Sequence, residues 1–347
     1  MFFYIALFLV YIVLTALYPK STKLGTIMIA VLFFFSAFRG SMVGTDTSHY
    51  LEIERILNER TQGSGFFWFL EYVYLYVVRL IFENNYSERW LILFLSIVTF
   101  LSLYGVAKRM KLLNPSLPLV FLVLFYCLSL NIARQMAGVS ILLYGYTFLL
   151  DDKPRSGWKF LLFVILSSMI HSICIIAVIS LLCRMTGVNK RALIILVVIV
   201  FFINVFSPLG FVEIILSYFT IGNYSVSYAD YSGVYQSNIV RVFTVGINII
   251  LLLLLFYNKS AISTTTEDNI FLFSILGTVL TLNMHSDVAR FELAFTIFQV
   301  VYISKLFQSN DKVRLIVWAF IIYNAILSLY FTAQGSGGLI PYYLEFN

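Results

Sequence analysis

The sequence predicts an all-α fold, a polytopic membrane helix bundle of about twelve transmembrane helices. Of the 347 residues, 61% are hydrophobic and 12% charged, and a soluble domain carries roughly twice that charged fraction. The mean hydropathy is +0.92, and apolar runs follow one another along the chain. Each span needs about 20 apolar residues. We therefore expect residues 1–347 to form a single transmembrane domain without a separate soluble one.

The apolar runs are expected to be helices, because a backbone in lipid must satisfy its hydrogen bonds within its own segment. The first run has no basic flank and no small-residue cleavage site, so we expect a retained span and not a signal peptide. The runs lie at 2–18, 24–38, 66–82, 90–107, 117–131, 134–150, 158–183, 191–207, 239–257, 269–285, 291–308 and 313–331.

Lysines and arginines predict the orientation, since cytoplasmic loops carry most of these residues in membrane proteins. The formal charge of +6 has this origin and does not indicate nucleic-acid binding. Both termini are then outside. The basic loops, all placed inside, contain Lys20, Lys23, Lys108, Arg109, Lys111, Lys153, Arg155, Lys159, Arg184, Lys190, Arg191, Lys259, Lys305, Lys312 and Arg314.

The run 66–82 is expected to lie at the membrane interface. Between Arg39 outside and Lys108 inside, the chain must cross an odd number of times, so 66–82 and 90–107 cannot both span. One stripe of 66–82 is polar, and phenylalanines and leucines fill the rest, as in an interfacial helix. The stripe consists of Glu71, Tyr72, Tyr76 and Arg79.

The run 158–183 is predicted to be a hairpin of two short helices that turns at His171. Cations flank it at both ends, and His171 and Ser172 stand at its middle. About 13 residues per arm is shorter than an α-helical span requires. The turn is expected on the outer side.

Two outer loops, 39–65 and 208–238, are predicted. The second contains no lysine or arginine, and its tyrosines and acids suit a sugar, because aromatic rings stack on C–H surfaces and carboxylates accept bonds from hydroxyls. The alternative is a belt of interfacial aromatic residues. The residues concerned are Glu213, Tyr218, Tyr224, Tyr228, Asp230, Tyr231 and Tyr235.

The stretch 39–50 is the first candidate site. Gly44 permits a turn, after which Asp46 or Thr47 is expected to cap a short helix with Tyr50, Ile53, Ile56 and Leu57 on its apolar face. Arg39 and Asp46 are candidates for binding and catalysis. The alternative is that Arg39 only extends to the interface and Asp46 only caps the helix.

Arg134 and Gln135 form the second candidate site. Together with Asn131 they stand between two apolar runs joined without a conventional loop. An arginine so near the apolar zone is costly and requires an anionic partner or a watery cavity. We therefore expect a functional role for Arg134.

His171 and the segment 285–290 complete the set. The unperturbed pKa of histidine, near 6.5, suits His171 for proton transfer, although a histidine packed in a core is the alternative. His285, Asp287 and Arg290 form a tight polar connection, in which Asp287 and Arg290 alternatively pair across a helix start. Several arginines on one face indicate an anion such as phosphate or diphosphate.

In this order and spacing, the polar residues resemble the EpsG family, Wzy-like polymerases of bacterial exopolysaccharide and capsule. The resemblance covers essentially the whole chain, and the segments 43–46 and 134–135 are its most specific parts. The matching residues are Phe38, Arg39, Val43, Gly44, Thr45, Asp46, Thr47, Tyr50, Asn131, Arg134, Gln135, His171, Ser172, Asp287, Val288, Ala289, Arg290 and Phe291.

The resemblance implies a multi-pass protein of the bacterial cytoplasmic membrane with a GT-C-like architecture and an outward-facing cavity. Its activity would be glycosyl transfer, moving the growing glycan from a polyprenyl diphosphate, such as undecaprenyl diphosphate, to a sugar hydroxyl of the next lipid-linked unit. The expected partners are the lipid-linked oligosaccharide donor and acceptor, membrane lipid, a chain-length regulator and a flippase, and no nucleic acid.

The resemblance also suggests roles for residues. Catalysis is assigned to Arg134 with His171 or Asp46 as the base. No cofactor or metal is expected, because arginines supply the charge and no glycine-rich nucleotide motif occurs. The alternatives are an O-antigen-ligase-like transferase of finished glycan, and a transporter of polysaccharide or lipid-linked sugar, which is not an enzyme. The residues assigned to diphosphate or substrate binding are Arg39, Tyr50, Gln135, His285, Asp287 and Arg290.

Overall fold

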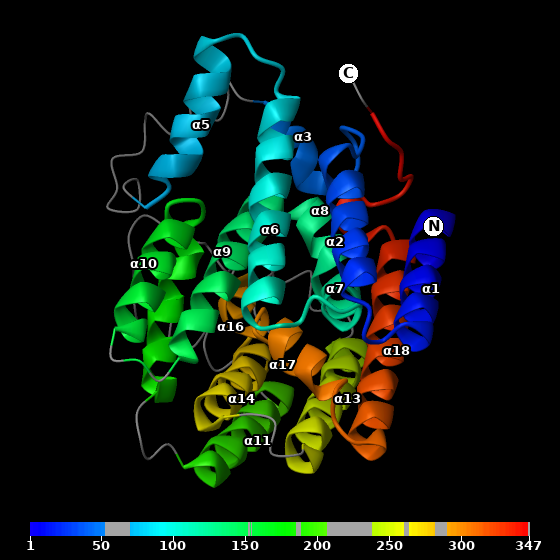
Figure 1. The fold of residues 1–347 in the computed structure, drawn as a ribbon, viewed down its shortest axis with the longest axis vertical. Helices are drawn as coiled ribbons and strands as arrows, with labels where there is room; N and C mark the ends of the chain where they lie inside the picture. Colours follow the sequence, from blue (N-terminus) through cyan, green and yellow to red (C-terminus); the bar gives the residue numbers. More distant parts are fainter. Residues whose placement is uncertain are drawn as a thin grey trace.

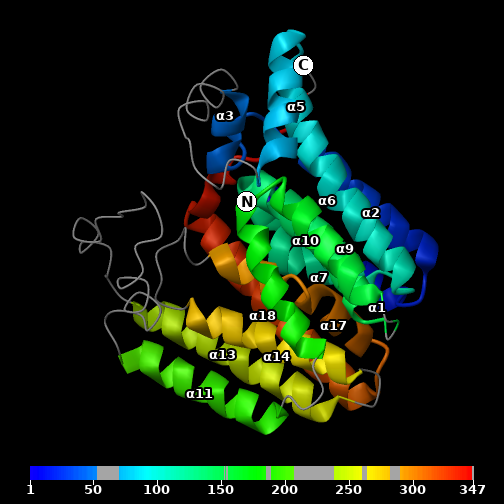
Figure 2. The same cartoon turned by 90° about the vertical axis from the view of Figure 1, so that its left-hand side faces the viewer.

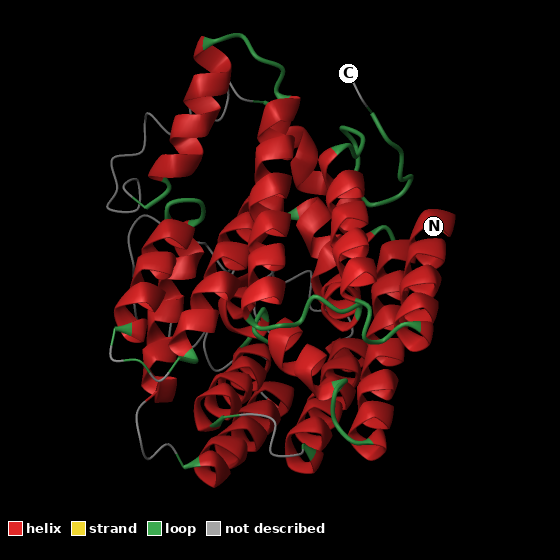
Figure 3. Cartoon of the chain, in the orientation of Figure 1, coloured by secondary structure: helices red, strands yellow, loops and turns green. Residues whose placement is uncertain are grey.

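The described part of the chain is helical. The computed structural model describes residues 1–52, 70–151, 153, 155–184, 189–206, 238–259, 264–281 and 290–345. Over these residues no strand occurs, and Figure 3 shows helices joined by loops. An isolated antiparallel bridge joins Arg39 to Leu344. The all-α prediction is confirmed.

The helices follow the predicted apolar runs closely. They are α1 (Phe2–Leu17), α2 (Thr22–Ala37), α3 (Thr45–Leu51), α5 (Tyr72–Glu83), α6 (Arg89–Arg109), α7 (Ser116–Phe121), the π-helical η2 (Leu122–Tyr126), α8 (Cys127–Asn131), α9 (Ala133–Leu149), α10 (Ser156–Ser168), the 3-10 helix η3 (Ser172–Arg184), α11 (Lys190–Phe206), α13 (Asn238–Asn258), α14 (Thr265–Leu280), the short 3-10 turn η5 (Arg290–Glu292), α16 (Leu293–Thr296), α17 (Gln299–Leu306), α18 (Asp311–Ala333) and η6 (Ser336–Gly338).

Helix α9 forms the centre of one half of the bundle, packed between α6 and α10 (Figures 1 and 2). Its glycines allow this close packing. A Cβ at Gly145 would stand 2.7 Å from the Cβ of Phe163, and one at Gly138 would stand 3.1 Å from the carbonyl oxygen of Ser167. Small residues of this kind let helix backbones approach each other in membrane bundles.

Helices α11, α13 and α14 form a second group, at the bottom of Figure 1. Lysines from three basic loops meet there at the buried start of α14. Lys190 Nζ lies 2.6 Å from Asp268 Oδ2. Lys259 also pairs with Asp268, and Lys305 pairs with Glu267. The loops that we predicted on one side of the membrane therefore come together in space.

The break predicted at His171 is confirmed. Helix α10 ends at Ser168, and η3 begins at Ser172 and packs against it. The second arm is a 3-10 helix, which rises about 2.0 Å per residue, so its 13 residues cover about 26 Å and not the roughly 20 Å of an α-helix. The longer rise offsets the short length of this arm.

The run 291–308 is divided, unlike the single helix predicted. The hydroxyl of Tyr146 donates to the carbonyl oxygen of Ala294 at 2.8 Å. The amide of Phe298, four residues on, bonds instead to the Phe295 carbonyl at 3.2 Å. The α-helical pattern is thus interrupted for two residues, Ile297 and Phe298, which separate α16 from α17.

Helix α5 is too short to span, in agreement with the exclusion of 66–82 from the spans. Its 12 residues cover about 18 Å, and it extends beyond the rest of the bundle in Figure 1. Its polar stripe was partly mispredicted. Tyr72 and Tyr76 are exposed, but Glu71 is 3% exposed and faces the protein interior. The placement of α5 at the interface stays a prediction.

Two described helices, α6 and α18, have both the length and the hydropathy to cross a membrane. Shorter apolar helices accompany them: Phe2–Leu17, Thr22–Ala37, Ser116–Asn131, Ser156–Ser168, Ser172–Arg184 and Val242–Asn258. The number of spans and the outer position of the termini stay predictions.

Candidate functional site

A cavity of about 190 Å³ joins segments that are far apart in the sequence. Asp46 and Tyr50 come from α3, Arg134 and Gln135 from the start of α9, His171 from the turn after α10, and Arg290 from η5. These are six of the predicted site residues. The remaining lining residues are His49 and Ile132.

Helix α3 is fixed against α8 by Gly44 and Asn131. Gly44 has a φ of 93°, and a Cβ there would stand 2.4 Å from the Leu130 carbonyl oxygen, so this turn requires glycine. Asn131 Oδ1 accepts bonds from Thr45 Oγ1 at 2.6 Å and from the Asp46 amide at 3.4 Å. Asn131 thus satisfies an amide at the start of α3 and places Asp46 at the cavity.

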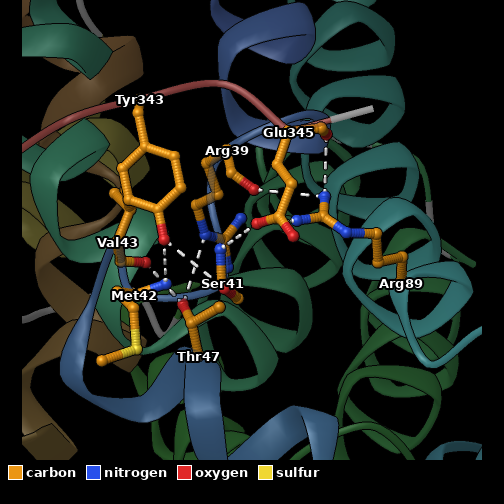
Figure 4. A network of polar contacts seen from close by, with 8 residues as sticks. All are labelled: Arg39, Ser41, Met42, Val43, Thr47, Arg89, Tyr343 and Glu345. Atoms are coloured by element: carbon orange, nitrogen blue, oxygen red, sulfur yellow. Dashed lines mark hydrogen bonds and ion pairs between the residues drawn. The ribbon is translucent and has the colours of Figure 1, made fainter. Parts of the chain in front are cut away.

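The C-terminal strap, residues 338–345, binds the loop 39–44 from the other side (Figure 4). The Gly40 amide donates to the Tyr343 carbonyl at 2.8 Å, and the Gly44 amide donates to the Gly338 carbonyl at 2.9 Å. Glu345 Oε2 accepts from the Ser41 amide at 2.9 Å. The loop before α3 is therefore held by chain from the opposite end of the sequence.

Arg89, in the first turn of α6, holds the end of the strap. It forms an ion pair with the carboxylate of Glu345 and donates to the Glu345 carbonyl oxygen at 2.9 Å. The Ser41 amide and Arg89 together lower the pKa of the Glu345 carboxyl. The strap thus ends in a charged contact to α6.

Arg39 lies outside the cavity lining and is 1% exposed. Its Nη1 donates to the Ser36 carbonyl oxygen at 2.7 Å, and its Nε donates to Thr47 Oγ1 at 3.3 Å. In this structure Arg39 joins the end of α2 to α3. The predicted contact between Arg39 and a diphosphate in the cavity is not supported by this placement.

Arg134 and Gln135 reach the cavity because the helix breaks at Ile132, whose ψ of 54° separates α8 from α9. This break replaces the conventional loop that the sequence lacks. The Gln135 amide nitrogen donates to the Arg290 carbonyl oxygen at 2.9 Å. Thr281 Oγ1 donates to Glu292 Oε2 at 2.8 Å and ties η5 to the end of α14. These bonds bring Arg290 next to the start of α9.

The anionic partner of Arg134 is Glu71, which sequence reasoning did not assign to the site. Glu71 Oε2 lies 3.1 Å from Arg134 Nη1, and the guanidinium carbon lies 4.8 Å from the centre of the Tyr74 ring. A signal existed in the sequence, since an arginine in this position requires an anion. Glu71 was missed because it belongs to the polar stripe on 66–82 and was taken for an exposed residue.

Tyr50 and His171 complete the described wall of the cavity. The Tyr50 hydroxyl accepts a bond from the Arg134 amide at 3.4 Å, and burial raises the pKa of Tyr50, so this hydroxyl is neutral at ordinary pH. Nδ1 of His171 accepts from the Ile173 amide at 3.4 Å.

Some predicted residues lie outside the described part of the chain. They are His285, Asp287, residues 53–65 of the first outer loop and nearly all of 208–238. The described residues alone place two arginines, two histidines and an aspartate around one cavity. Guanidinium groups bind phosphate oxygens, and an imidazole or a carboxylate accepts a proton.

The described part of the chain thus combines a helical architecture and apolar helices, as in a membrane protein, with a cavity that two arginines line at the ends of several helices. The chain belongs to the EpsG family, which it matches over residues 22–344. Membership makes it a membrane protein of the polysaccharide polymerase type. No curated protein matches the chain, and no solved structure does.

Proposed function

We propose that this protein polymerises lipid-linked oligosaccharide repeat units at the outer face of the bacterial cytoplasmic membrane, in exopolysaccharide or capsule biosynthesis. The observation that carries the proposal is the cavity in which Arg134 and Arg290 meet His171 and Asp46. Membership of the EpsG family supports it. A flippase would deliver the units, and a chain-length regulator would act on the product.

In the proposed reaction, Arg134 and Arg290 bind the diphosphate of the donor lipid. An acceptor sugar hydroxyl attacks the anomeric carbon of the growing glycan, and the bond from that carbon to the diphosphate oxygen breaks. The arginines stabilise the charge that develops on the departing polyprenyl diphosphate. The hydroxyl proton passes to His171 or Asp46. The activated lipid diphosphate supplies the energy.

We propose that transfer does not need a metal ion, because two guanidinium groups supply the positive charge at the diphosphate. Polymer formation by the purified protein should persist in EDTA. Loss of polymer in EDTA, with recovery after Mg²⁺ is added, would contradict this part of the proposal.

The function is tested by substituting lysine for the cavity arginines. Arg134→Ala is a poor test, because it leaves the Glu71 carboxylate buried without its cation and destabilises the protein. Arg134→Lys and Arg290→Lys keep the charge and lose bidentate recognition. Chain lengthening should fall on the order of 100-fold in each, with single lipid-linked repeat units accumulating in cells. Normal polymer from both variants would contradict the proposal.

A gene deletion separates the proposal from its two alternatives. A polymerase deletion accumulates single repeat units, whereas a ligase deletion accumulates long unligated chains. A transporter would move lipid-linked sugar across vesicles that contain no other flippase, and such flux without chain lengthening would favour that class.

A further inference from the structure

The first turn of α5 contacts both the arginine side and the histidine side of the cavity. We propose that Glu71 is a positioning residue for the polymerase reaction: its carboxylate holds Arg134 with one oxygen and the His171 turn with the other. This inference rests on the proposed function. Glu71 does not line the cavity, so it would act through those two residues and not on the substrate.

The arginine contact is a buried ion pair combined with an aromatic stack. Glu71 Oε2 lies 3.1 Å from Arg134 Nη1, and the two side chains are 4% and 17% exposed. Because Glu71 is buried and Arg134 only partly exposed, the pair is stronger than one in open water. The Tyr74 ring, one turn along α5, covers the same guanidinium at 4.8 Å. Together they fix the position of the guanidinium at the cavity wall.

The histidine contact uses the second carboxylate oxygen. Glu71 Oε1 accepts from Ser172 Oγ at 3.1 Å and from the Ser172 amide at 3.4 Å. In the same turn of α5, the Tyr74 amide donates to the Met169 carbonyl oxygen at 3.2 Å. Residues on both sides of His171 are therefore bonded to α5, which fixes the backbone that carries the imidazole.

The Glu71 carboxylate joins Arg134, which is proposed to bind the anion, to the turn that carries His171, a candidate proton acceptor. It therefore sets the distance between Arg134 and His171. Catalysis by positioned groups is sensitive to such distances, and a displacement of about 1 Å can cost about 100-fold in rate. The link is also independent of substrate. Glu71 would therefore contribute to the stability of the folded protein as well as to the geometry of the site, and activity must be compared at equal amounts of folded protein.

The test compares Glu71→Gln with Glu83→Gln in the purified full-length protein. The substrate is lipid-linked repeat units extracted from a source strain that lacks the gene. Glu71→Gln keeps the side-chain shape and an acceptor for Ser172 but removes the negative charge beside Arg134. Glu83→Gln removes the same charge from the same helix, where Glu83 forms an exposed pair with Arg79. We expect kcat to fall roughly 10- to 100-fold in Glu71→Gln and to stay unchanged in Glu83→Gln.

Two further variants distinguish positioning from stability. Ser172→Ala removes one bond to Glu71 Oε1 and leaves the ion pair intact, so its loss of kcat should be smaller than that of Glu71→Gln. In an Arg134→Lys background, Glu71→Gln should cost much less than it does in the wild type, because residues that act as a unit are not additive. Thermal unfolding is measured for every variant.

The outcomes separate the two proposals. If the wild-type protein fails to lengthen chains under conditions where it is folded, the proposed function fails. If the wild type is active and Glu71→Gln matches Glu83→Gln in kcat, the inference about Glu71 is overturned. It is also overturned if Glu71→Gln loses activity only in proportion to lost folded protein, or if its effect is fully additive with Arg134→Lys.

Discussion

Arg39, which is buried, and Arg134, which is partly exposed, have different surroundings. Arg134 has Glu71 as its counter-ion and borders the cavity. For Arg39, the described part of the chain provides hydroxyl and carbonyl acceptors, and burial lowers the pKa of Arg39 to about 10. That pKa is still above neutral, so Arg39 remains charged at pH 7. We therefore assign Arg39 to the support of α3.

Arg39→Lys should lower stability without changing substrate affinity. A lysine can reach the Ser36 carbonyl but cannot also donate to Thr47, so about one hydrogen bond is lost, worth about 1 kcal/mol. The midpoint of thermal unfolding should fall, and KM for the lipid-linked donor should not change. Arg290→Lys is the matched comparison and should raise KM. A raised KM for Arg39→Lys at unchanged thermal stability would instead indicate that Arg39 binds the substrate.

The candidate site was predictable where polar residues interrupt apolar runs, because such residues are costly in a membrane without a function or a partner. Asp46, Arg134 and His171 were found on this basis. Glu71 was missed because an amphipathic helix can turn its polar side either to water or to a buried cation, and the sequence does not distinguish these. Arg39 was found, but its distance from the cavity depends on how α2 packs against α3.

At the scale of elements, the packing of α9 against the hairpin of α10 and η3 determines where His171 lies. A Cβ added at Gly138 would stand 3.1 Å from Cys174 Sγ and 3.3 Å from the Cβ of His171. These contacts are tighter than side chains normally make, so either the helix or the turn must move. The turn carries His171, one of the two candidate bases, and its position depends on the absence of a side chain at Gly138.

Gly138→Ala should therefore reduce chain lengthening, by about 10-fold or more if the turn moves by several tenths of an ångström. Gly277→Ala is the control, since its added Cβ would meet the Phe295 side chain at an ordinary 3.6 Å. Activity of both variants is measured on the same lipid-linked units, and the amount of folded protein is measured by size-exclusion chromatography. Equal activities for the two variants would argue against this role of α9.

The C-terminal strap has a pH dependence that Glu345 determines. Its pKa is lowered from the ordinary 4.5 by the Ser41 amide, with a smaller effect from Arg89. A lowered folded pKa means that the stabilisation is present above about pH 4.5 and is lost as pH falls through the folded pKa. Glu345→Gln should thus lower the thermal midpoint at pH 7, by a free energy below about 1 kcal/mol for a partly exposed pair.

The same comparison is repeated in acid. The difference between Glu345→Gln and wild type should shrink as the pH is lowered below 4.5, because the wild-type carboxyl then also becomes neutral. Glu83→Gln, which removes a carboxylate from an exposed pair on α5, serves as the control. A wild-type advantage that persists at full size in strong acid would show that Glu345 does not stabilise the strap through its charge.

At the scale of the whole molecule, η3 connects two polar regions. The candidate site lies at its start, and the ion pairs between lysines and the acids of α14 lie at its end. At its start, Ser172 bonds to Glu71 beside the cavity. At its end, the Cys183 carbonyl accepts from Asn269 at 3.0 Å, next to the acids of α14 that pair with Lys190 and Lys305. The 3-10 rise separates these ends by about 26 Å, close to the thickness of the hydrocarbon core.

The sequence alone predicted much of this arrangement, because hydropathy marks the helices and the bias of lysine and arginine marks one side. It did not predict the divided helix at 291–308 or the 3-10 form of η3. Hydropathy marks an apolar run and not the type or continuity of the helix that it forms. The strap was also not predicted, because backbone pairing between residues 40 and 343 leaves no local pattern.

The predicted orientation is tested by single cysteines at Met42 and Lys108 in a variant whose native Cys127, Cys174 and Cys183 are replaced. Met42 is 71% exposed and lies on the loop that the strap binds. Lys108 is exposed at the end of α6.

With the cavity on the outer side, a membrane-impermeant maleimide should label Met42→Cys in intact cells and label Lys108→Cys only after the membrane is opened. Helix α6 has 21 residues and is about 31 Å long, so it separates the depth of position 42 in the membrane from that of position 108. The reverse pattern would place the cavity inside and exclude polymerisation at the outer face, and labelling of both positions in intact cells would mean that α6 does not cross the membrane.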